Sequence, residues 1–396
     1  MPSDVRVLAP AELEAALRLL IHVFGQQAHD EDIPVELDTA DPARFYGSFD
    51  DGALVAAAGS FDLRLTIPGA VIAAAGVTWV GVLPTHRRQG LLTSLVTRQL
   101  HDLHAADTAV AALWASEGAI YQRFGYGPAS WHLSVTVPSG AVFRRPVAAG
   151  SLRLVTPDAA ALAPVYDAVA ARTPGWFARD DAWWAYRLHD PEHARDGATP
   201  QRCVVTTGGY ALYSQTSRWA DGLPGGVVTV RELVAADEGA RERLWRYLLD
   251  LDLMTEVSCR LIATDDPLLH LLAEPRAVRA RLSEDLWVRL VDVGAALASR
   301  AYACDIDAVL EVVDEQCPWN AGQWRLTGGP QGGQCVRTDA ATDLVVGVAD
   351  LGSAFLGGTP LSARRAGIQE LTPGSLQRVS TAFGPVGGAP WCPMVF

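Results

Sequence analysis

The spacing of apolar residues along the first third of the chain predicts helices and strands in alternation. Residues 10–24 carry apolar side chains near a 3.6-residue period, which is typical of an amphipathic helix, and Leu91–His104 repeats that pattern. Runs rich in β-forming residues predict strands at Ala53–Ala58, Phe61–Ile67, Ala70–Val82, Ala109–Trp114 and Trp131–Val137. Because Gly59-Ser60 and Pro68-Gly69 are turn-type residues, we expect turns between the first three strands.

The same order of elements recurs in the middle of the chain. After the linker-like residues Ser139–Gly150, a strand is predicted at Leu152–Val155 and a helix at Asp158–Arg172. Three strand-like runs and a helix follow at Arg202–Thr207, Tyr210–Gln215, Gly226–Leu233 and Gly239–Leu253. A further helix and strands follow Val291. We therefore predict a mixed α/β (α+β) chain in three parts, residues 1–145, 146–290 and 291–396.

Length and charge limit the class of protein. A chain of 396 residues exceeds one ordinary core, which agrees with several parts. The net charge of −13 argues against a general nucleic-acid binder and suits a cationic partner, although such a charge also serves solubility alone. The sequence has neither a long apolar run nor the pattern of a signal peptide, so we expect no membrane association and a cytoplasmic location.

The cysteine and histidine patterns give little support for a metal site. Six cysteines lack Cys-x-x-Cys spacing, which predicts reduced and buried thiols at Cys203, Cys259, Cys304, Cys317, Cys335 and Cys392. His189 and His193 are four residues apart. Because Pro191 between them breaks a helical face, we predict an exposed turn and no bound metal.

The segment Val80–Leu92 carries the strongest signal for chemistry. A strand-like run ends in a short loop that contains Arg87, Arg88 and Gly90, and an amphipathic helix follows at once. Such a loop binds phosphates, because loop N–H groups and the positive helix N-terminus point at the anion while arginines add charge. An ordinary turn with surface arginines is the alternative, since the chain has no lysine and uses arginine for all its basic charge.

Two blocks of sequence resemble the GNAT acyltransferase superfamily. Its coenzyme A loop reads Arg/Gln-x-x-Gly-x-Gly/Ala, and Arg87, Gly90 and Leu92 occupy the three marked positions. Leu92 departs from the usual small residue, as it does in the Eis-type (enhanced intracellular survival) aminoglycoside acetyltransferases. The second block, Leu113–Gly127, resembles the segment from the fifth strand of that family to its catalytic tyrosine. The resemblance extends over nearly the whole chain.

The resemblance implies a fold, a co-substrate and the residues that bind it. The fold is a tandem pair of GNAT units, the second degenerate, followed by a sterol-carrier-like domain whose C-terminus reaches the active site. Acetyl-CoA is the implied co-substrate, with no metal. Residues implied to contact it are Val80, Val82, Arg87, Arg88, Gln89, Gly90, Leu91, Leu92, Ser116 and Glu117.

The resemblance also implies an acid and a base. Tyr126 is the implied acid for the leaving thiolate, with Tyr121 as a second candidate, although both side chains also suit ordinary core packing. The α-carboxylate of Phe396 is the implied base. Independently of the family, the last six residues are unusually apolar for a free tail, so burial of the chain end is expected. An ordinary α-carboxyl pKa is about 3.5, and desolvation raises it.

The acceptor is expected to be a small, cationic molecule with several amines. Residues at the start of the family's acceptor loops are Phe24, Gln26, Asp30, Glu31 and Asp32. A solvated acidic loop is the alternative, and Gln26 stands where the family commonly has an acidic residue. The resemblance further implies a homohexamer.

Three functions remain open at this point. The first is acetyl-CoA-dependent N-acetylation of aminoglycosides, polyamines or lysine side chains. The second is acyl transfer with another donor or another small amine. The third is binding of an apolar ligand by the C-terminal part, with a vestigial acyltransferase unit. The intact Arg-x-x-Gly loop and Tyr126 favour an enzyme.

Overall fold

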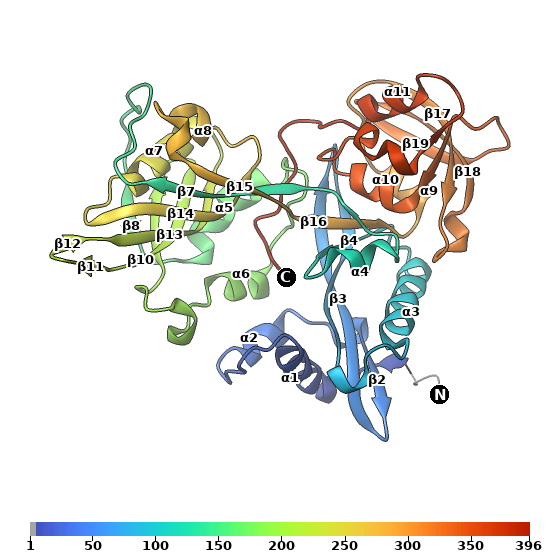
Figure 1. The fold of residues 1–396 in the computed structure, drawn as a ribbon, viewed down its shortest axis with the longest axis horizontal. Helices are drawn as coiled ribbons and strands as arrows, with labels where there is room; N and C mark the ends of the chain where they lie inside the picture. The colour runs from blue at the N-terminus through green and yellow to red at the C-terminus, as the bar shows by residue number, and fades with distance from the viewer. Residues whose placement is uncertain (1–4) are drawn as a thin grey trace. The chain divides into compact units, whose positions relative to one another are not determined.

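The computed structural model describes residues 5–396, and most of its strands and helices are labelled in Figure 1. The chain forms two compact units. The first unit contains the residues up to Ser130, Glu284–Pro390 and Met394–Phe396. The second contains Trp131–Ser283 and Trp391–Pro393.

A mixed, seven-stranded sheet organises the N-terminal half of the first unit, in the order β1-β2-β3-β4-β5-β16-β6. Its strands are β1 (Val5–Val7), β2 (Phe45–Asp50), β3 (Ala53–Ile67), β4 (Ala70–Val82), β5 (Val110–Trp114), β16 (Leu286–Leu290) and β6 (Gly127–Pro128). Its helices are α1 (Leu13–Val23), α2 (Ile33–Asp38), α3 (Leu91–Ala105) and α4 (Gly118–Gln122). Helices α1 and α3 bury the apolar faces that their spacing predicts, against β3 and β4.

The expected turn at Gly59-Ser60 is wrong, because β3 continues through both residues to Ile67. The glycine serves packing instead of a turn. A Cβ atom built on Gly59 would lie 2.0 Å from a ring carbon of Phe45, so only glycine leaves room for this ring. The Phe45 side chain is fully buried between Phe61 and Trp79. A glycine that admits a ring and one that makes a turn look alike in sequence.

The second unit contains another seven-stranded sheet, in the order β15-β7-β14-β13-β10-β9-β8. Its strands are β7 (Trp131–Pro138), β8 (Arg153–Val155), β9 (Arg202–Thr206), β10 (Gly209–Thr216), β13 (Gly226–Ala235), β14 (Met254–Ala263) and β15 (Arg279–Glu284). A hairpin of β11 (Trp219–Ala220) and β12 (Leu223–Pro224) is separate from it. Its helices are α5 (Ala159–Ala170), α6 (Asp181–Leu188), α7 (Glu238–Leu249) and α8 (Leu268–Leu271).

The two sheets exchange strands along the chain. Strand β7 follows the elements of the first sheet in sequence, but its residues pair with β14 in the second sheet. Strand β16 follows the second sheet and pairs with β5 and β6 in the first. The sequence pattern predicts Trp131–Val137 as a strand, and the structure confirms it as β7. Apolar alternation does not specify the partner strand, because any sheet with one buried face accepts it.

The core of the second unit contains a buried ion pair. Arg179 donates to both carboxylate oxygens of Glu232, at 3.1 and 2.6 Å, and the Tyr210 hydroxyl donates to the same carboxylate at 2.6 Å. Burial alone would raise the pKa of Glu232, but Arg179 and Arg187 lower it to about 2. The carboxylate is therefore charged in the folded state, and its partners must be present for the unit to remain stable.

We expect Glu232→Gln to destabilise the second unit by about 3 kcal/mol at pH 7, since it leaves a buried guanidinium without its countercharge. The folded pKa lies below the ordinary 4.5, so this stabilisation is full above pH 4.5 and declines as the pH falls toward 2. Chemical unfolding at several pH values measures the effect. The variant should lose this acid-dependent decline, and an unchanged decline would contradict the assignment.

The C-terminal part of the first unit has a five-stranded sheet in the order β19-β18-β17-β20-β21. Its strands are β17 (Ile306–Val313), β18 (Gly322–Gly329), β19 (Gly332–Arg337), β20 (Leu344–Gly347) and β21 (Gln369–Glu370). Its helices are α9 (Val293–Ala298), α10 (Val348–Ala354) and α11 (Ser375–Ala382). Helix α10 packs directly on β16 and β6, where Gly127 and Gly352 allow close backbone approach.

All six cysteines are free thiols, and the predicted burial is confirmed for five of them, whereas Cys304 is half-buried. Across residues 5–396, the structure contains no helix long and apolar enough to cross a bilayer.

Candidate functional site

Two parallel strands of the first sheet separate beside the loop that the sequence singles out. Within the described residues, β4 and β5 pair only where Ala75 and Gly76 face Ala111 and Ala112. Strand β4 then continues to Val82 and β5 to Trp114. Each remains paired on its other side, β4 with β3 and β5 with β16. The sheet therefore opens at Gly76 and leaves one backbone edge of β4 unpaired with β5.

Strand β4 bulges along this opening. Its register with β3 changes between the pairs Ala57–Gly81 and Gly59–Thr78, so Trp79 and Val80 both face Ala58. Trp79 has a φ of 52°, in the left-handed region that large side chains rarely adopt. Its ring is buried, with its centroid 4.7 Å from that of Phe45. The bulge interrupts the regular ladder at the residues that border the opening.

The loop after β4 presents its backbone and its arginines at the start of α3. Arg88 and Gly90 have φ values of 63° and 85°, and Gly90 directly precedes the helix. The first N–H groups of a helix have no partner within it, and the first turn of α3 has no acidic residue. Arg87 and Arg88 form no ion pair with any described residue. The helix N-terminus is therefore positive and open to an anion.

A cavity of about 560 Å³ connects the loop to the separated strands. Its lining comes from the end of α1, from β4, from the loop and the first turn of α3, and from the segment around α4. The lining residues are Val23, Phe24, Val80, Gly81, Val82, His86, Arg87, Arg88, Gly90, Leu91, Leu92, Thr93, Ser116, Glu117, Ile120, Tyr121 and Arg123. Its volume lies within the ordinary range for small-molecule sites.

The structure brings together nearly all of the residues expected to bind the co-substrate. Every residue of that set lines the cavity except Gln89. Among the five expected to bind the acceptor, only Phe24 is in the lining, where its side chain is 51% exposed. Gln26 and Glu31 are exposed outside it, and Asp32 precedes α2. Asp30 accepts from Arg18 at 2.9 Å on the surface, which is one reason that it does not face the cavity.

Sequence reasoning missed two residues with polar side chains in the lining, His86 and Arg123. The Nε2 atom of His86 is 3.1 Å from the Asp50 carboxylate. Arg123 directly follows α4, and its guanidinium lies 4.9 Å from the centre of the Phe124 ring. As the single arginine of the Leu113–Gly127 block, Arg123 could have been identified from the sequence.

The two candidate tyrosines occupy different environments. Tyr121 lines the cavity, and burial together with the charge of Glu117 raises its pKa to about 12. Tyr126 lies behind it, with ring centroids 5.9 Å apart and no exposed surface. Burial raises the Tyr126 pKa well above its ordinary value, an effect that Arg289 partly offsets. The Tyr126 hydroxyl is buried and has no hydrogen-bond partner among the described residues.

The chain ends within the first unit, against the opened strands. The Phe396 ring lies edge-on to Phe61, with centroids 6.3 Å apart. A Cβ atom built on Gly76 would lie 3.1 Å from a Phe396 ring carbon, so the ring rests on the last pair of residues that joins β4 to β5. Expected burial of the chain end is confirmed for Trp391, Cys392 and Met394.

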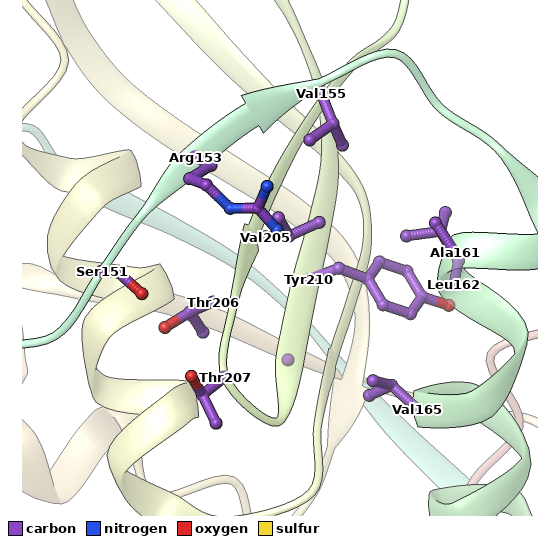
Figure 2. A pocket seen from close by; sticks show the side chains of 11 residues that line it. Ser151, Arg153, Val155, Ala161, Leu162, Val165, Val205, Thr206, Thr207 and Tyr210 are labelled. Atoms are coloured by element: carbon purple, nitrogen blue, oxygen red, sulfur yellow. The ribbon is translucent and has the colours of Figure 1, made fainter.

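A second cavity, of about 260 Å³, lies in the second unit between β8, β9 and α5. Figure 2 shows Arg153, Thr206 and Tyr210 around it, with the apolar side chains of α5 on one side. No arginine–glycine loop borders it, and Tyr210 directs its hydroxyl to Glu232. Among residues 5–396, no group of three or more histidine, cysteine or acidic side chains could hold a metal ion.

Three segments match models of known domain families. Residues 4–129 and 175–290 each match an acetyltransferase (GNAT) domain, and residues 293–393 match a sterol carrier protein domain. The predicted fold class, tandem GNAT folds followed by a sterol-carrier-like domain, is thereby confirmed. The degenerate second copy is recognised as a GNAT domain although it lacks the phosphate-binding loop.

Comparison with whole proteins agrees with the domain matches. The chain is 40% identical to an uncharacterized N-acetyltransferase of Streptomyces avermitilis, over 100% of both chains. It is 35% identical over 81% of both chains to the N-acetyltransferase Eis of Mycobacterium tuberculosis. The crystal structure of Eis1 from Mycobacterium abscessus matches with a TM-score of 0.88 and 34% identity, and the match covers 100% of both chains.

Proposed function

Because the chain belongs to the Eis-type N-acetyltransferases of the GNAT superfamily, we propose that it transfers the acetyl group of acetyl-CoA to an amine of a small cationic acceptor. One observation carries the proposal. A single cavity joins the arginine loop and the N-terminus of α3 to the opening between β4 and β5, and the chain end lies at the closed end of that opening. Acyl transfer from coenzyme A needs a place that binds the phosphates and, at the other end of the same cavity, a place where the thioester meets the amine.

The loop end of the cavity binds the pyrophosphate in this proposal. Arg87 and Arg88 supply charge, and the N–H groups of Leu91 and Leu92 supply hydrogen bonds at the positive end of α3. The pantetheine arm then follows the unpaired edge of β4 at Val80–Val82, which offers it backbone groups in place of the missing strand. Ser116 and Glu117 border the arm on the other side.

The reaction is direct transfer. The acceptor amine attacks the thioester carbonyl carbon, so that an N–C bond forms and the C–S bond breaks. An aliphatic amine has a pKa of about 10.4 and is mostly protonated at neutral pH, so a base must accept a proton before or during attack. The Phe396 carboxylate is the proposed base, and Tyr126 is the proposed acid that protonates the leaving thiolate. The products are the N-acetylated amine and coenzyme A with a free thiol.

The proposed acceptor class is a molecule with several amines, such as an aminoglycoside, a polyamine or a lysine side chain. The net charge of −13 favours approach of cations. Phe24, half-exposed at the rim of the cavity, offers a ring on which a cation can rest. Glu31 is exposed nearby in sequence and adds negative charge to the segment that follows Phe24.

We expect the double variant Arg87→Gln/Arg88→Gln to weaken acetyl-CoA binding about 30-fold, because it removes two charge-assisted bonds to phosphate that contribute about 1 kcal/mol each at an exposed site. Titration calorimetry with acetyl-CoA measures the change. The charge-matched control is Arg279→Gln/Arg281→Gln, on an exposed strand of the second unit. If both double variants weakened acetyl-CoA binding equally, the effect would come from overall charge. That result would contradict the assignment of the Arg87–Arg88 loop as the phosphate site.

A further inference from the structure

We propose that Trp114 is a positioning residue that fixes the C-terminal carboxylate at the opening between β4 and β5. The inference rests on the proposed function, because Trp114 would position the carboxylate that serves as the base in the proposed reaction. Within the first unit, Met394 contacts Trp114, and Phe396 contacts Phe61 and Gly76.

A hydrogen bond anchors the chain end two residues before the carboxylate. The indole Nε1–H of Trp114 donates to the Met394 carbonyl oxygen at 2.8 Å, across 280 positions of sequence. The Met394 side chain is only 4% exposed, whereas that of Val395 is 40% exposed. Val395, between the anchor and the carboxylate, is therefore less buried than Met394. The hydrogen bond at Met394 limits how far the last two residues can move.

Trp114 is itself firmly placed. It is the last residue of β5, and its backbone pairs with Leu286 of β16 in the sheet. It lies two residues beyond Ala112, where β4 and β5 stop pairing. The indole donor therefore comes from one side of the opening. Gly76, on the other strand at the same point, supports the Phe396 ring.

Aromatic packing holds the other side of the chain end. The Phe396 ring contacts Phe61, Phe61 contacts Phe45, and Phe45 contacts Trp79 at the bulge, with centroid distances of 6.3, 6.0 and 4.7 Å. This row of rings joins the terminal residue to the irregular segment of β4. Ring contacts fix the side chain of Phe396 but act weakly on the direction of its carboxylate. The hydrogen bond from Trp114 supplies the directional restraint on the backbone.

A base on a chain end requires such restraint. Terminal residues are ordinarily disordered, and an error of about 1 Å in the position of a catalytic group lowers rates by up to about 100-fold. A tryptophan whose N–H holds a backbone carbonyl places the chain without adding a charge that would pair with the carboxylate. The contact restrains the backbone two residues before the carboxylate and adds no charge of its own.

The test is Trp114→Phe, which keeps an aromatic ring and removes the N–H donor. We expect kcat to fall about 10-fold or more while KM for acetyl-CoA changes less than twofold, since the variant moves the base and not the coenzyme A loop. The matched control is Trp319→Phe. Trp319 is also half-buried in the first unit and donates its Nε1–H to a backbone carbonyl at 2.8 Å, but that carbonyl belongs to Val291 and not to the chain end. The control should retain its kcat.

A double-variant cycle separates positioning from general damage. Appending Gly-Gly after Phe396 converts its carboxylate into an amide carbonyl. If Trp114 acts through that carboxylate, adding Trp114→Phe to the extended chain should lower kcat by less than twofold more. The positioning role would be overturned if the combined variant lost kcat by the product of the two single factors. It would also be overturned if Trp319→Phe lowered kcat as much as Trp114→Phe does. If the extension alone leaves kcat unchanged, the proposed base fails. If the extension reduces kcat and Trp114→Phe does not, only the present inference fails.

Discussion

Appending Gly-Gly to the C-terminus is expected to lower kcat for amine acetylation at least 100-fold. The extension leaves the Phe396 ring in the sequence but removes its carboxylate, the proposed acceptor of the amine proton. General bases ordinarily contribute factors of 10² to 10⁴. Steady-state rates at saturating acetyl-CoA measure the loss, and acetyl-CoA binding by calorimetry should change less than threefold, because the arginine loop is untouched.

Two controls identify the carboxylate as the cause. The same Gly-Gly extension at the N-terminus should have no effect on kcat. Phe396→Leu keeps the carboxylate and removes the ring that contacts Phe61 and Gly76, so it should retain more activity than the extended chain. If Phe396→Leu were as inactive as the extension, the ring rather than the carboxylate would carry the role. If the extension were fully active, the base would lie elsewhere.

Tyr126→Phe is expected to lower kcat about 100-fold without destabilising the protein. The Tyr126 hydroxyl is buried with no hydrogen-bond partner among the described residues, and an unsatisfied buried hydroxyl costs about 1–3 kcal/mol. Its removal should therefore leave the melting temperature unchanged or raise it, while the thiolate loses its proton donor. Activity and thermal unfolding of one preparation measure both effects.

Tyr121→Phe is the matched comparison, because Tyr121 is also buried and contacts Tyr126. It should lower kcat less than fivefold if Tyr126 is the acid. The opposite ranking would transfer the acid role to Tyr121, which lines the cavity directly. Because burial raises the pKa of both hydroxyls, each stays protonated through pH 9, and neither tyrosine should produce a basic limb in the pH–rate profile below that value.

Local patterns sufficed to predict the loop and its helix. Arg87, Arg88 and Gly90 are adjacent in sequence, and the strand before them and the helix after them have clear apolar periods. The structure confirms the helix as α3, and Gly90 at its start has a left-handed backbone conformation. A motif whose parts are contiguous needs no tertiary information.

Features that depend on distant contacts could not be derived from residue patterns alone. Gly59 resembles a turn residue, but it makes room for Phe45 from another strand. The exchange of β7 and β16 between sheets follows from pairing that sequence periodicity leaves undetermined. The contact between Trp114 and Met394 spans almost three-quarters of the chain, and neither residue belongs to a pattern that signals it.

The acceptor loop shows a different limit. Asp30, Glu31 and Asp32 form an acidic run, which in sequence resembles a binding site for cations. In the structure Asp30 pairs with Arg18, and the run does not line the cavity. Acidic runs at the ends of helices are usually solvated, and local charge alone does not show which side chains face a pocket. Phe24, which precedes this run in sequence, does line the cavity.

Release of free coenzyme A thiol from acetyl-CoA tests the central claim most directly. The assay uses the full chain with an aminoglycoside, a polyamine, a lysine-rich peptide and a simple monoamine, and the signal from the protein's six cysteines is subtracted. The account predicts thiol release that depends on the acceptor, is greater with the multi-amine acceptors than with the monoamine, and is lost when Gly-Gly follows Phe396. No release above the acceptor-free rate with any of these amines would contradict it.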